Sequence, residues 1–165
     1  ANELVTFIRQ HTGNHFELMV AAYPEIHPES NSYDSDIKFL KQKFDAGANS
    51  AITQYFFNSD AYGFYIDQCK KIGIDQPIYP GIMPITNFDN LVRFSKNCGA
   101  EIPRWLSHKA EALKDSPEEL QSFYIETVST LCERLLTMGA PGLHFYTMNQ
   151  ADHILEICKN LGIES

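Results

Sequence analysis

The stretch KFDAGANSAITQYFF, residues 43–57, decides the fold class. It begins as the last turn of a helix, passes through a glycine and becomes an apolar strand. The order of helix end, glycine and strand recurs in KKIGIDQPIYPGIMP, residues 70–84, and in LLTMGAPGLHFYTMN, residues 135–149. Strands that alternate with helices predict a parallel sheet covered by helices, so the chain falls in the α/β class.

The alternation extends outward over the whole chain. Apolar residues at helical spacing predict helices over 1–10, 34–47, 60–73, 87–99, 103–113, 116–139 and 150–162. Apolar runs predict strands over 16–22, 50–57, 77–85 and 142–149. Asp34 and Ser35 are the expected caps of the second helix, and Ser116, with Pro117 and Glu119 behind it, is the expected cap of the longest.

Polar residues concentrate where the predicted strands end, among them Tyr23, Gln54 and Tyr146. This position is typical of ligand sites in α/β barrels and doubly wound sheets. Four strands are half of the eight that a closed barrel needs over roughly 250 residues. The pattern therefore favours the second half of a barrel, and a compact four-stranded open sheet is the alternative.

Charge and composition narrow the function classes. The chain has 165 residues, 21% of them charged, and a net charge of -8, which argues against a nucleic-acid or acidic-membrane partner. No apolar run is long enough to span a bilayer. Four cysteines without a CxxC pair predict reduced thiols in a cytoplasmic protein; they are Cys69, Cys98, Cys132 and Cys158.

The segment VAAYPEIHPES, residues 20–30, ends an apolar run in an aromatic residue, a histidine and two carboxylates between prolines. Glu25, His27 and Glu29 alternate along it, but residues two apart on an extended segment do not converge on one ion, so we expect no metal site. Both carboxylates follow a turn, and we interpret them as solvated rather than as catalytic acids. From the residues alone, His27 is more readily explained as a surface histidine than as a ligand.

Four motifs together reveal a family: VAAYPEIHPES, DAGANSAITQYFF, PGIMPITNF and GLHFYTMNQ resemble the bacterial type of 5,10-methylenetetrahydrofolate reductase. The match covers essentially the whole chain in order. The resemblance implies a (β/α)8 TIM barrel, of which residues 1–165 would be the C-terminal half, strands five to eight of a single domain.

The resemblance also implies cofactors and site residues. The family uses FAD, with NADH or NADPH as reductant, to reduce 5,10-methylenetetrahydrofolate to 5-methyltetrahydrofolate by ping-pong hydride transfer. Positions matching the FAD contacts are Ala21, Tyr23, His27, Asp36 and Lys43. Positions matching the substrate contacts are Gln54, Asn90, Phe94 and Gln150, where Asn90 replaces a glutamine and Gln150 replaces an arginine of many members.

The family's catalytic glutamate lies in a segment like SFEFFPP, and the aspartate that tunes its flavin lies in an RGD segment. Neither segment occurs in this sequence, so we expect no catalytic residue in this chain. The expected partners are a small-molecule folate and either a second copy of the chain or the missing N-terminal half. The alternative hypothesis is a non-catalytic half-barrel or binding module.

Overall fold

Short parallel strands and longer helices alternate in the computed structural model, which describes residues 1–163. The strands are β1 (Met19–Ala22), β2 (Ser50–Thr53), β3 (Ile78–Tyr79), β4 (Gly81–Ile82) and β5 (His144–Phe145). The helices are α1 (Asn2–Thr12), α2 (Tyr33–Asp45), α3 (Ser59–Lys71), α4 (Phe88–Cys98), α5 (Arg104–Ala112), α6 (Pro117–Thr137) and α7 (Asp152–Asn160). The predicted α/β class is confirmed.

Strand order follows chain order. β1 pairs with β2 and β2 with β3, while β4 pairs with β5, and every pair is parallel. The single strand predicted over 77–85 is wrong in one respect, because Pro80 divides it into β3 and β4. Proline has no N–H to donate to a ladder. The chain therefore exchanges β2 for β5 as its pairing partner within three residues.

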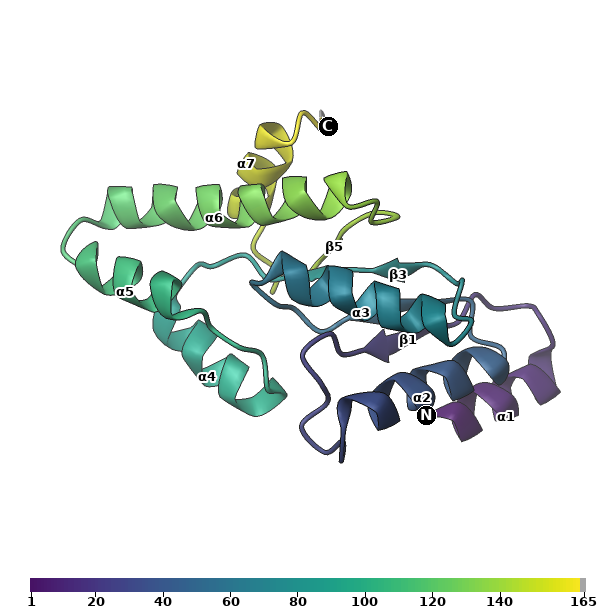
Figure 1. Ribbon diagram of the computed structural model, residues 1–165. Coiled ribbons are helices and arrows are strands. Elements are labelled where there is room, and N and C mark those ends of the chain that lie inside the picture. The colour runs from purple at the N-terminus through teal and green to yellow at the C-terminus, as the bar shows by residue number, and fades with distance from the viewer. Residues whose placement is uncertain (164–165) are drawn as a thin grey trace.

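The helices form a layer whose order matches that of the strands. α1 packs on α2, α2 on α3, α3 on α6 and α6 on α7. Figure 1 shows α6 and α7 on the upper side of the strands and α1 and α2 on the lower side, with α4 and α5 together at the left.

The two faces of the sheet differ in exposure. Ala21, Ile52 and Tyr79 lie in register, so their side chains share one face, where Ala21 is exposed and the other two are half-buried. Ala51 and Ile78 lie on the opposite face and are 0% and 4% exposed. The helices therefore cover one face, and the other is partly open.

Gly81 sits at the junction between the two groups of strands. Its N–H donates to Thr53 Oγ1 at 2.8 Å, and the hydroxyl of Tyr146 donates to the Thr53 carbonyl at 2.9 Å. A Cβ on Gly81 would lie 2.2 Å from the Thr53 oxygen and 2.6 Å from Tyr146 Cε2. Only glycine fits here, because the backbone of β4 approaches the end of β2 so closely.

Of the two predicted helix caps, the one for α2 is wrong and the one for α6 is correct in position. Ser32, rather than Asp34 or Ser35, caps α2: its hydroxyl accepts from Ser35 N, and Ser35 bonds back to the Ser32 backbone, which completes a capping box. Ser116 precedes α6 as expected, with Pro117 in its first turn, but its side chain makes no capping hydrogen bond.

Ser32→Ala should lower the free energy of unfolding by about 1 kcal/mol, because it removes an acceptor from the first turn of α2. Ser122→Ala, at an exposed position within α6, is the matched control and should change stability by less than about 0.5 kcal/mol. Chemical denaturation of the two variants measures the difference, and equal midpoints would contradict the capping role.

All four cysteines are free, as predicted. Cys69 on α3 and Cys132 on α6 are fully buried, and burial raises the pKa of each thiol to about 12. Within residues 1–163, none of the helices combines the length and the apolar character that crossing a membrane requires.

Candidate functional site

The segment after β1 turns sharply at the carboxyl end of the sheet. Ile26 N donates to the Tyr23 carbonyl at 3.2 Å, and Ile26 has φ of 69°, in the left-handed region that a β-branched residue rarely adopts. The turn brings the His27 ring edge-on to the Tyr23 ring, with centroids 4.5 Å apart and planes at 82°.

Two hydrogen bonds orient His27. Its backbone N–H donates to Asp36 Oδ2 at 3.1 Å, and its Nδ1 accepts from Glu29 N at 3.0 Å. Because Nδ1 is an acceptor, the neutral ring carries its proton on Nε2. His27 therefore has an N–H to offer to an acceptor on a ligand.

Four of the five predicted cofactor residues line one pocket of about 370 Å³; they are Tyr23, His27, Asp36 and Lys43. Asp36 and Lys43 are two turns apart on α2 and so lie on the same side of the helix. The fifth residue, Ala21, is exposed beside the pocket, and its carbonyl accepts from Lys43 Nζ at 2.7 Å. The structure thus brings these five positions together.

Burial affects both charges in this pocket. Burial raises the pKa of Asp36, whereas the hydrogen bond from His27 N–H and the positive charge of Lys43 act to lower it. Burial lowers the pKa of Lys43, whereas the negative charge of Asp36 acts to raise it. A half-buried ammonium beside donors such as His27 Nε2–H suits an anionic ligand group.

Three of the four predicted substrate residues line a second pocket, of about 230 Å³; they are Asn90, Phe94 and Gln150. Its floor comes from the ends of β4 and β5, through residues such as Pro84 and Tyr146. All three predicted residues are exposed at its rim, Phe94 by 36%. Asn87, which also lines this pocket, caps α4 by accepting from Asn90 N at 2.9 Å, so the helix begins at the pocket.

Sequence reasoning missed Arg93, which does not line this pocket but contacts two residues that do. Its Nη2 donates to Asn90 Oδ1 at 3.1 Å, and its guanidinium carbon lies 5.4 Å from the centre of the Phe94 ring. The sequence does contain a signal for Arg93: it lies next to Phe94 and three positions after Asn90 on the same helix.

The fourth predicted substrate residue, Gln54, does not line that pocket. It follows β2 and borders a narrow crevice with Tyr23, Glu25 and Cys98. Its Oε1 accepts from Tyr55 N at 3.0 Å. Gln54 therefore lies outside both pockets, in a crevice that shares Tyr23 with the first.

The interpretation of Glu25 as solvated is wrong. The side chain is half-buried, and its Oε2 accepts from Glu101 N at 2.8 Å. Burial raises the pKa of this carboxyl, while the hydrogen bond from Glu101 acts in the opposite direction. Glu29, in contrast, is exposed, as predicted.

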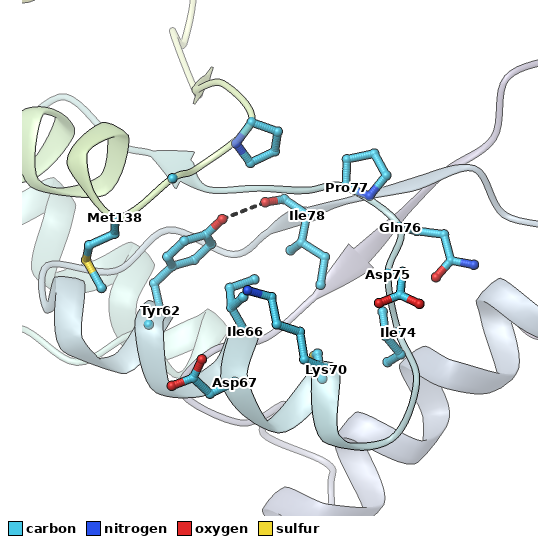
Figure 2. Close-up of a pocket in the computed structure, with 14 residues that line it drawn as sticks. Tyr62, Ile66, Asp67, Lys70, Ile74, Asp75, Gln76, Pro77, Ile78 and Met138 are labelled. Carbon is cyan, nitrogen blue, oxygen red and sulfur yellow. Dashed lines mark hydrogen bonds between the residues drawn. The ribbon is translucent and has the colours of Figure 1, made fainter.

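A larger pocket, of about 570 Å³, lies elsewhere. Figure 2 shows it between α3 and the starts of β3 and β5, where Tyr62 donates to the Ile78 carbonyl at 2.8 Å. It contains none of the predicted site residues and opens at the amino ends of the strands, away from the two pockets described above. Across residues 1–163, no three His, Cys, Asp or Glu side chains gather as metal ligands.

Comparison with known proteins gives one consistent family. A family model described as methylenetetrahydrofolate reductase matches residues 1–162. The chain is 41% identical over 164 residues to "Probable methylenetetrahydrofolate reductase (NADPH)" of Caenorhabditis elegans, covering 99% of this chain and 25% of that protein. It is 37% identical over 172 residues to "Methylenetetrahydrofolate reductase (NADH) 1" of Arabidopsis thaliana, covering 99% and 29%.

A bacterial relative and a solved structure extend this result. The chain is 38% identical over 163 residues to 5,10-methylenetetrahydrofolate reductase of Escherichia coli (strain K12), covering 99% of this chain and 54% of that protein. It thus spans about half the length of this bacterial relative. An uncharacterised Clostridium thermocellum protein, described as binding two copies of 5-methyl-5,6,7,8-tetrahydrofolic acid, has a similar fold, with a TM-score of 0.64 and 22% identity over 96% of this chain and 57% of that chain.

Proposed function

Because the chain belongs to the methylenetetrahydrofolate reductase family, we propose that it forms part of an enzyme that reduces 5,10-methylenetetrahydrofolate to 5-methyltetrahydrofolate. The reductant would be NADH or NADPH, both of which occur in the names of relatives. The observation that carries the proposal is the pair of pockets at the carboxyl ends of the strands. One gathers the cofactor positions, and the other gathers three substrate positions.

The residues of the first pocket fit FAD. Lys43 and the Nε2–H of His27 are donors suited to a pyrophosphate, and Tyr23 offers a ring and a hydroxyl. Asp36 can accept from ligand hydroxyl groups. Bound FAD would supply the hydride chemistry, and these residues would hold and orient it.

The second pocket fits the folate. Phe94 offers an aromatic wall to a flat ring system, and Asn90 and Gln150 offer amides that both donate and accept. Arg93 is a cation beside this rim, where it contacts Asn90 and Phe94. Since Gln150 carries no charge, we propose that Arg93 binds the carboxylate of the folate's glutamate tail. In this arrangement Gln54 would reach the substrate from the side of the cofactor pocket.

The chain would be the C-terminal half of a TIM barrel. Strand order that follows chain order, helices in the same order, and one partly open face of the sheet all support this arrangement. The open edges of β1 and β5 would pair with the N-terminal half, or with a second copy of the chain. The enzyme would work in the cytoplasm, with the catalytic acid contributed from outside these 165 residues.

The test uses the protein purified as its cell produces it. We expect flavin absorbance bands, oxidation of NADH or NADPH by the bound flavin, and reoxidation of that flavin by 5,10-methylenetetrahydrofolate. A preparation that binds neither flavin nor folate would overturn the reductase proposal and favour the non-catalytic module.

Arg93→Gln should weaken folate binding about tenfold, because a hydrogen bond to a charged group contributes about 1.5–3 kcal/mol. The matched control is Arg104→Gln, on the exposed surface of α5 and outside both pockets. Titration of ligand-induced fluorescence changes measures both variants. Equal affinities would remove Arg93 from the site.

A further inference from the structure

Two contacts connect the segment after β1 to the end of α4. The first is the hydrogen bond from Glu101 N to Glu25 Oε2, which joins residues 76 positions apart in the sequence. The second is between Pro28 and Gly99, the left-handed C-cap of α4 with φ of 74°. A Cβ on Gly99 would lie 2.9 Å from Pro28 Cγ, so the proline lies directly against the backbone of the cap.

The crevice between these elements is almost filled. It has a volume of about 10 Å³, which is room for about one water molecule. Tyr55 and Ser95 add a third connection below it, where their hydroxyl oxygens lie 3.0 Å apart in the buried interior. The C-terminal half of α4 is thus packed against both the segment that follows β2 and the segment that follows β1.

Ile26 shows that this segment is restrained from both sides. A left-handed β-branched residue is strained, and such a conformation persists only where neighbouring contacts impose it. The residue before it, Glu25, is bound to the end of α4, and the residue after it, His27, donates to Asp36 on α2. His27 is held to α2 through Asp36 without any help from Glu25, so the Glu25 contact fixes the end of α4 against this segment rather than the reverse.

α4 carries Asn90 and Phe94, which line the second pocket, whereas the segment after β1 carries Tyr23 and His27, which line the first. Glu25 is the side chain that binds one element to the other. We propose that Glu25 is a positioning residue, which sets the separation of the cofactor and folate pockets through its bond to Glu101 N. The assignment of ligands to these pockets rests on the proposed function, but the connection itself does not.

Three variants test the role of Glu25 in the whole protein. Glu25→Ala removes the acceptor, Glu25→Gln keeps an acceptor oxygen without the charge, and Glu101→Ala keeps the backbone donor. We expect Glu25→Ala to speed amide exchange at residues 98–102 and to weaken binding of 5-methyltetrahydrofolate about tenfold, with less than about a twofold change in flavin affinity. Glu25→Gln should restore most of the folate affinity, and Glu101→Ala should match the parent protein.

A double-mutant cycle with Phe94→Ala separates positioning from general destabilisation. If Glu25 acts through α4, its effect on folate affinity should shrink markedly in the Phe94→Ala background, whereas independent sites would give additive effects. Additive effects, an equal loss of flavin and folate binding, or unchanged exchange at residues 98–102 would each overturn the proposal. Failure of the parent protein to bind folate would instead count against the proposed function, while the exchange experiment would still test the connection.

Discussion

Gly81→Ala is expected to lower the free energy of unfolding by about 3 kcal/mol or more, at the upper end of what overpacking costs. The new methyl group would meet the Thr53 carbonyl at 2.2 Å, and this carbonyl cannot move without disturbing β2. It would also displace Tyr146, whose hydroxyl donates to the same carbonyl. The substitution therefore affects the connection between the two groups of strands.

Gly142→Ala is the control, since a Cβ there would lie 3.4 Å from the Tyr79 ring, an ordinary contact. Thermal unfolding should show a midpoint for Gly81→Ala that is lower by roughly 10 °C, and a much smaller change for Gly142→Ala. Similar midpoints for the two variants would show that β4 does not approach β2 as closely as described.

Lys43→Met is expected to weaken flavin binding at least about tenfold, because it removes the half-buried ammonium of the cofactor pocket while keeping most of its aliphatic length. Lys43→Arg retains the charge and should give an intermediate loss, since its planar group cannot reproduce the same geometry. Titration of the apoprotein with FAD measures each affinity.

Lys41→Met is the matched control on the same helix. Lys41 forms its ion pair with Asp45 along the surface of α2 and lies outside the cofactor pocket. Flavin affinity should be the same as in the parent protein, and stability nearly so, because exposed ion pairs contribute little. If the Lys41 and Lys43 variants retained flavin equally, the assignment of this pocket to FAD would be wrong.

The features that can be predicted from the sequence are those that depend on the spacing of apolar residues and on the positions of glycines. The helices were found because their apolar residues recur at helical spacing, and several of them end at glycines with positive φ, such as Gly99. Strand lengths were overestimated, because an apolar run continues past the last ladder hydrogen bond: the run 50–57 is strand only to Thr53. Beyond Thr53 the apolar side chains are still buried in the core, although the backbone no longer belongs to the strand.

The candidate site was predicted in part, for a similar reason. Asp36 and Lys43 share a helix face, so their proximity follows from local spacing. The contact of Glu25 with Glu101 joins residues far apart in the chain, and no local pattern reports it. The same holds for Gln54, whose place in the narrow crevice depends on how α4 packs against the segment after β2.

The agreement of strand order with chain order has a consequence for biosynthesis. β2 pairs with β1 and β3 pairs with β2, in each case with a strand made shortly before it, so these three strands can assemble before β5 is made. The pairing of β4 with β5 encloses a much longer loop, which contains α4, α5 and α6, and longer loops close at a greater entropic cost. The chain is synthesised at about 5–20 residues per second, and the edge of β4 stays unpaired until β5 has been made. During this interval we expect the unpaired edge to need protection by chaperones.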